Sequence, residues 1–158
     1  MKKSDLILIG IVVLFVLLAL FSSKGNEKLD EVDYPLTLAG SAGLHEMTYS
    51  DYKSYVLEGK AFIVVIERAG CSFCVQYMPI VEEVAKEKKI PLYYIDTDKL
   101  TADEMNELST TNNYLKRNKW GTPTTLFMLG DRVIDAIGGY VDKDSVLAFI
   151  DKKVVMGE

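Results

Sequence analysis

The chain contains two cysteines, Cys71 and Cys74, which stand three residues apart in the segment AGCSFC. Two thiols at this spacing can bind a metal ion, form a structural disulfide or exchange disulfides with another protein. A tetrahedral zinc site needs two further ligands, usually cysteine or histidine. The chain has no other cysteine and a single histidine, His45. A bridge between Cys71 and Cys74 would close a very short loop and would add little stability. We therefore expect no metal and no cofactor, and interpret the pair as a redox centre.

The position of the pair along the chain supports this interpretation. Cys71 follows an apolar run of strand length and stands at the start of a predicted helix, where unpaired amides and the helix dipole lower the pKa of a thiol. The thiolate is the species that attacks a disulfide, so we expect Cys71 to be the nucleophile. Cys74, one turn further into the helix, is placed to resolve a mixed disulfide on Cys71.

The elements that must position the two thiols alternate between helix and strand. Apolar runs predict the strands, and apolar residues at helical spacing or residues that cap helices predict the helices. Strands are expected over residues 61–67, 91–96, 124–129 and 132–137, and helices over residues 48–59, 74–89, 101–109 and 142–153. Residues 110–119 fit neither pattern. Strands separated by helices favour parallel pairing, and the final hairpin adds antiparallel strands, so the predicted fold class is α/β with a mixed central sheet.

A second motif, WGTPT at residues 120–124, stands directly before an apolar strand. Proline is tolerated at the first residue of a strand, and cis bonds before proline are rare, so the motif alone does not fix the isomer of Pro123. Trp120 lies beside this loop. A place on the rim of a substrate site and a place in the core are both open for it.

The N-terminal segment has the composition of a membrane anchor. Residues 6–21 form an uncharged apolar run that follows Lys2 and Lys3. With the two serines after it, the run reaches the length needed to cross a bilayer. No small-residue cleavage motif ends it, so we expect an uncleaved transmembrane helix over residues 6–23 rather than a signal peptide.

The same reasoning divides the rest of the chain. The positive-inside rule keeps residues 1–5 in the cytoplasm, so the domain at residues 44–158 would lie outside the cell membrane, where disulfides persist. Residues 24–43 are polar and acidic, as expected of a linker. The net charge of −5 and the lack of a basic stripe argue against nucleic-acid binding.

Residues 44–153 together resemble the thioredoxin family. The resemblance rests on AGCSFC after a buried strand, GTPT before a hairpin, Pro79 eight residues after Cys71, and a closing helix. It implies a three-layer α/β/α sandwich in which Pro123 is cis and packs beside the cysteine pair. Thr122 would then offer its backbone to an extended substrate. More narrowly, residues 61–98 resemble the bacteriocin transport accessory proteins of Gram-positive bacteria.

The chain departs from cytoplasmic thioredoxins at two places near the cysteines. Those proteins carry a buried aspartate where this chain has Val65, and Gly-Pro between the cysteines where it has Ser72-Phe73. The usual base for the resolving thiol is therefore absent. Glu67 is a candidate substitute, although we expect it to be a solvated carboxylate at the end of a strand.

These features predict a membrane-anchored thiol–disulfide oxidoreductase. Its partners would be protein or peptide thiols and disulfides, together with a membrane redox protein. The direction of electron flow stays open between oxidase, isomerase and reductase. The alternative is a non-catalytic module of the same fold that docks a secreted peptide or a transporter.

Overall fold

The centre of the fold is strand β2, Ala61–Glu67, in which all seven residues are buried. Its sequence AFIVVIE is apolar and rich in β-branched residues, as suits a strand covered on both faces. β2 pairs in parallel with β3 (Pro91–Asp96) on one side and antiparallel with β4 (Thr124–Leu129) on the other. The computed structural model describes residues 32–156, and its folded unit begins at Asp33.

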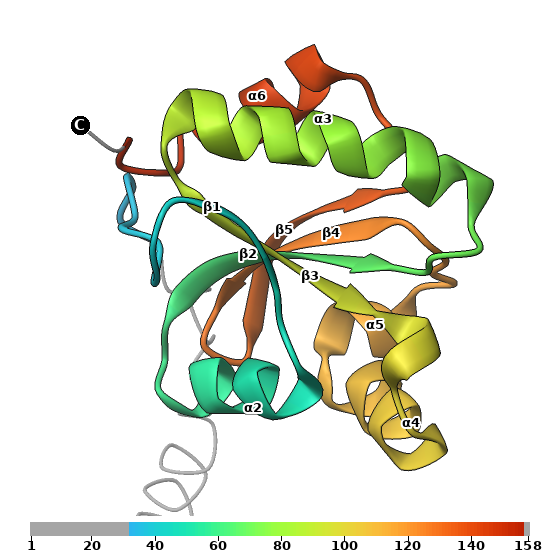
Figure 1. Cartoon of the computed structure of the whole chain (residues 1–158). Helices are drawn as coiled ribbons and strands as arrows, with labels where there is room; N and C mark the ends of the chain where they lie inside the picture. Colours follow the sequence, from blue (N-terminus) through green and yellow to red (C-terminus); the bar gives the residue numbers. More distant parts are fainter. Residues whose placement is uncertain (1–31, 157–158) are drawn as a thin grey trace, which may run out of the picture. The chain divides into compact units, whose positions relative to one another are not determined.

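The sheet has five strands in the order β1-β3-β2-β4-β5 (Figure 1). The outer strands are β1 (Gly43–Glu46), which is parallel to β3, and β5 (Arg132–Gly138), which is antiparallel to β4. The predicted mixed sheet is confirmed. Strand β1 was not predicted, because its sequence GLHE has one large apolar residue and no alternating pattern.

Helices cover both faces of this sheet, which gives the predicted three-layer sandwich (Figure 1). One face carries α3 (Ser72–Lys88) and α6 (Lys143–Asp151), and the other carries α2 (Tyr49–Leu57), α4 (Ala102–Thr111) and α5 (Asn113–Arg117). Thr48 and Thr101 form capping boxes at the starts of α2 and α4. The Asn112 side chain accepts hydrogen bonds from the first amides of α5, which explains the break in the unassigned segment.

Alternation along β2 separates the core into two clusters. Ile63 and Val65 pack under α3 and α6, whereas Phe62, Val64 and Ile66 pack against the opposite helices. The same alternation directs the last residue of β2, Glu67, towards the α3 face. The position of this carboxylate is therefore a consequence of strand geometry.

The folded unit extends further towards the N-terminus than residue 44. Leu36 forms a bridge with Val154, and Leu38 is buried in the cluster under α3 and α6. Part of the segment predicted as a linker over residues 24–43 therefore packs against the domain. The predicted anchor over residues 6–23 lies outside the described residues. Within residues 32–156, no helix combines the length and apolar character needed to cross a membrane.

Candidate active site

The two thiols lie where α3 begins. β2 ends at Glu67, a turn follows, and Cys71 is the N-cap residue of α3. The backbone N–H of Cys74 donates a hydrogen bond to Cys71 Sγ at 3.3 Å. A sulfur therefore takes the place of the usual capping oxygen, beside unpaired amides at the positive end of the helix dipole. The helix starts two residues before the predicted position, and both cysteines are free thiols.

The two thiols differ in exposure and in acidity. Cys71 is 9% exposed, whereas Cys74 is 2% exposed. A hydrogen bond from the Cys74 thiol, supported by the Thr122 side chain and backbone amides, lowers the pKa of Cys71 to about 7. Burial raises the pKa of the Cys74 thiol, and its hydrogen bond to Cys71 raises it further. Near neutral pH, the less deeply buried sulfur, that of Cys71, is therefore the more ionised one.

The WGTPT loop, far away in sequence, meets the cysteines at this point. The Thr122–Pro123 bond is cis, as the resemblance implies, and Pro123 is buried. The Cys71 thiol donates a hydrogen bond to the Thr122 carbonyl oxygen at 3.2 Å. Only the protonated Cys71 thiol can donate this hydrogen bond, so the bond opposes ionisation of Cys71. The hydrogen bonds that Cys71 Sγ accepts from the Cys74 thiol and from backbone amides favour ionisation.

Two further hydrogen bonds hold this loop in place. The Gly139 amide donates to the Pro123 carbonyl at 2.8 Å, and the Thr124 hydroxyl donates to the Gly121 carbonyl at 2.6 Å. The loop is thus tied to the end of β5 as well as to the start of β4. The backbone that faces Cys71 is fixed from both sides.

Trp120 lies both in the core and beside the WGTPT loop, the two positions that the sequence left open. Its ring is half-buried and packs against the core cluster that contains Phe62. It also lines a hollow of about 310 Å³ together with Thr122 and Pro123. Trp120 is therefore a core residue that also borders the loop next to Cys71.

Exposed apolar side chains lie on the first turn of α3 and on the segment that follows β5. Phe73 lies between the two cysteines and is 59% exposed, and Val75 is 65% exposed. Tyr140 is also exposed and contacts the Tyr77 ring, with 6.1 Å between the ring centres. Val75 belongs to the apolar helical pattern over residues 74–89, which predicts a buried position for it. It is exposed instead, because the first turn of α3 borders an open groove.

This groove has a volume of about 430 Å³ and contains Glu67 beside Cys74. We name it the Glu67 groove. Its lining also includes Leu44 of β1, Tyr94 of β3, Ala69 of the turn, and Val75, Met78, Pro79 and Glu82 of α3. Sequence reasoning missed it, because strands β1 and β3 and helix α3 come together here only in the folded chain.

Glu67 is 7% exposed, so the expectation of a solvated carboxylate is wrong. The reason is the alternation of β2, which turns this side chain under α3. Burial raises the pKa of Glu67, and the nearby carboxylates Asp96 and Asp98 raise it further. In the part of the chain that the structure describes, no hydrogen bond or ion pair reaches the Glu67 carboxyl group.

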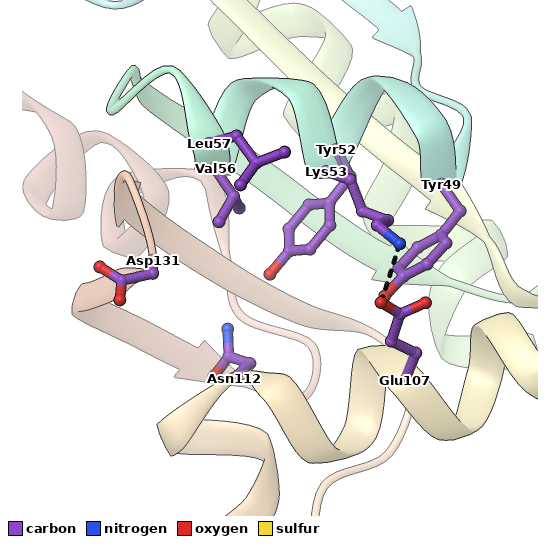
Figure 2. Close-up of a pocket in the computed structure, with 8 residues that line it drawn as sticks. All are labelled: Tyr49, Tyr52, Lys53, Val56, Leu57, Glu107, Asn112 and Asp131. Atoms are coloured by element: carbon purple, nitrogen blue, oxygen red, sulfur yellow. Dashed lines mark hydrogen bonds and ion pairs between the residues drawn. The ribbon is translucent and has the colours of Figure 1, made fainter.

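A second hollow, of about 190 Å³, lies against α2 (Figure 2). We name it the α2 pocket. It is lined by Tyr49, Tyr52, Lys53, Val56 and Leu57 of α2, Glu107 of α4, Asn112, and Asp131 of the hairpin turn. Neither cysteine lines it, and neither do Thr122 or Pro123. Lys53 and Glu107 form an ion pair across its mouth at 2.8 Å.

Comparison with known proteins identifies the fold. No protein-family model matches the sequence. The chain is similar to solved structures of thioredoxins, whose own chains are almost completely covered. They include thioredoxin from Malassezia sympodialis (18% identity, TM-score 0.53, 75% of this chain and 96% of that one) and thioredoxin f from spinach chloroplasts (17%, 0.55, 72% and 95%). A third is the reduced thioredoxin pre-protein of Schistosoma mansoni (19%, 0.53, 70% and 97%). The chain therefore has a thioredoxin-like fold.

Proposed function

We propose that this chain is a thiol–disulfide oxidoreductase that acts on protein or peptide substrates through Cys71 and Cys74. The observation that carries the proposal is the asymmetry of the pair. One thiol caps a helix and has a pKa of about 7, while its hydrogen-bonded neighbour is buried and has a raised pKa. This is the arrangement that a nucleophile and a resolving thiol need. The thioredoxin-like fold supports the proposal without fixing the activity.

In the reducing direction, the Cys71 thiolate attacks one sulfur of a substrate disulfide, and the other substrate sulfur leaves as a thiolate. Cys74 then loses its proton, and its sulfur attacks Cys71 Sγ. This step forms the Cys71–Cys74 disulfide and releases the second substrate sulfur as a thiolate. The substrate gains two electrons and the protein loses two. Oxidation of a substrate dithiol follows the same steps in reverse, starting from the Cys71–Cys74 disulfide.

The loop at Thr122 and Pro123 would align the substrate. The Thr122 carbonyl already faces Cys71 Sγ, so an extended peptide that hydrogen-bonds to this backbone would present its sulfur to Cys71. Trp120 borders the same loop and would contribute to its rim. The exposed side chains of Phe73 and Tyr140 would add apolar contacts.

The location of the protein belongs to the same proposal. The uncharged run over residues 6–23 and the preceding lysines would anchor the chain in the cell membrane, with the folded domain outside. A membrane redox protein would then restore the starting state of the pair. A role beside the export of a secreted peptide, as in bacteriocin transport accessory proteins, is the narrower form of this proposal.

The test is trapping of the mixed disulfide. The full chain carrying Cys74→Ala is reduced, mixed with a protein that contains disulfides, and quenched with acid for mass spectrometry. We expect a covalent adduct on Cys71, because the resolving thiol is absent. The Cys71→Ala variant serves as the matched control and should form far less adduct. Absence of an adduct on Cys71, together with no turnover by the wild-type chain, would overturn the proposed function.

A further inference from the structure

Glu67 is 7% exposed and has no counter-ion among residues 32–156. Its neighbour Arg68, the first residue after β2, is exposed. Lys99 is engaged with Glu46 at 2.5 Å. Removing a carboxylate from water is unfavourable unless a cation or several hydrogen-bond donors replace the water. In the described chain, neither a cation nor a donor reaches the Glu67 carboxyl group. No fully buried side-chain oxygen of the described chain lacks a partner, so the Glu67 oxygens keep a small contact with solvent in the groove that this residue lines.

The surroundings of Glu67 favour positive charge. Asp96 of β3 stands beside it in the sheet register, and Asp98 and Glu46 lie close enough to influence its ionisation. These three acidic groups outnumber the one cation, Lys99, that acts on Glu67 in the opposite sense. The interior of the groove therefore has a negative potential that a cation would relieve.

The walls of the Glu67 groove are mainly apolar. Leu44, Val75, Met78 and Pro79 line it, and the second carboxylate, Glu82, is exposed and already paired with Lys86 at 2.6 Å. An inorganic divalent cation needs several oxygen ligands, which such walls do not supply. Lysine and arginine side chains instead combine an apolar stem with a cationic head, and this combination matches the groove.

We propose that the Glu67 groove binds a lysine or arginine side chain of the substrate polypeptide, with the Glu67 carboxylate as its counter-ion. The inference rests on the proposed function. Ala69 and Cys74, which line the groove, flank Cys71 in the chain. A cationic residue close to the substrate cysteine would reach the groove while the substrate sulfur is bonded to Cys71. The groove would thus select among substrates.

The test uses short peptides whose single cysteine is disulfide-bonded to thionitrobenzoate, which absorbs light when it is released. Within each set, one position that flanks the cysteine carries Lys, Gln or Glu, and separate sets vary separate positions. The full chain is reduced, and the rate constant for release of thionitrobenzoate is measured for each peptide. We expect the Lys peptide of at least one set to react about tenfold faster than its Gln partner, which is the effect of one charge-assisted hydrogen bond.

The variants separate a specific site from general attraction. Glu67→Gln should abolish the preference, so that the Lys and Gln peptides of a set then react at equal rates. Glu83→Gln removes the same charge from an exposed position of α3, where Glu83 pairs with Lys143. It should keep the preference, and melting curves of both variants confirm that they are folded. A preference that survives Glu67→Gln would come from the net charge of −5 and would overturn the site.

Two other outcomes also contradict the proposal. If the wild-type chain reacted with the Lys and Gln peptides of every set at equal rates, the groove would not bind a cationic side chain of the substrate. If Glu67→Gln slowed the Lys and Gln peptides of every set by the same factor, the carboxylate would act on the cysteine pair rather than on the substrate. If no peptide reacted faster than it does with Cys71→Ser, the proposed function itself would fail, and the substrate role of the groove with it.

Discussion

The α2 pocket and the Glu67 groove are both lined largely by apolar side chains, but they differ in how their polar groups are satisfied. In the α2 pocket, Lys53 pairs with Glu107 (Figure 2). The Asn112 side chain accepts hydrogen bonds from two backbone amides. In the groove, Glu67 has no counter-ion in the described chain, and Cys74 has a raised pKa. The raised pKa values of Glu67 and Cys74, rather than concavity, make the groove the better candidate for a functional site.

The largest expected effect is the loss of disulfide exchange when Cys71 is replaced. Cys71→Ser removes the thiolate that attacks the substrate, so disulfide exchange should fall to the rate of the uncatalysed reaction. Leu57→Ala, which changes an exposed residue of the α2 pocket, should leave the rate unchanged. Reduction of insulin by the reduced full chain measures both. Comparable activity in Cys71→Ser would remove the functional distinction between the two hollows.

Substitution of a buried residue of the α2 pocket should lower the stability of the protein rather than its activity. Tyr52 is 3% exposed and packs against Phe62, so Tyr52→Ala should lower the free energy of unfolding by about 3–5 kcal/mol. Leu57 lines the same pocket but is 83% exposed, and Leu57→Ala should change stability by less than about 0.5 kcal/mol. Urea denaturation gives both values. Exchange by the folded fraction of Tyr52→Ala should match the wild-type rate, and a specific loss of exchange would give the pocket a functional role.

The ionisation of Cys71 should appear in a pH profile. Because its pKa is lowered to about 7, alkylation by iodoacetamide should rise about tenfold per pH unit below this value and level off above it. The hydrogen bond from Cys74 is the largest cause of this shift, so Cys74→Ala should move the midpoint to higher pH. A wild-type midpoint near the ordinary value of a free thiol would contradict the assignment of Cys71 as the nucleophile.

The smallest expected effect is the loss of stability when the ion pair between Lys53 and Glu107 in the α2 pocket is removed. Lys53 and Glu107 are both about half exposed, so Lys53→Gln should lower the free energy of unfolding by less than about 1 kcal/mol. The difference from wild type should shrink further at high salt, since exposed charges are screened. A larger loss of unfolding free energy, measured by urea denaturation, would mean that this ion pair contributes more to stability than its exposure implies.

Most of the sheet could be predicted from local sequence. The continuous apolar runs of β2 and β3 and the hairpin that turns at Gly130 carry their own signals, and all three are confirmed. Strand β1 carries no such signal, because it exists through pairing with β3. Leu36 and Leu38 were overlooked for a similar reason, since their burial depends on α3, α6 and the C-terminal segment.

The candidate site divides in the same way. The spacing of Cys71 and Cys74 is local, so the thiols could be found from the sequence. The contact between Cys71 and Thr122 joins distant parts of the chain and was implied only by the family resemblance. The burial of Glu67 was predicted wrongly, because the residues that cover a strand end are not visible in the strand itself.

If Cys71 and Cys74 form one reversible redox pair, a redox titration of the full chain should show it. The chain is equilibrated in glutathione buffers of increasing oxidation, quenched with acid and analysed for free thiols. We expect both thiols to disappear together as an intramolecular disulfide forms, with the dependence on buffer potential of a two-electron couple. A midpoint near about −270 mV would favour a reductase, and one near about −120 mV an oxidase. Thiols that persist under oxidising conditions, or glutathione adducts on Cys71 without an intramolecular bond, would contradict the claim.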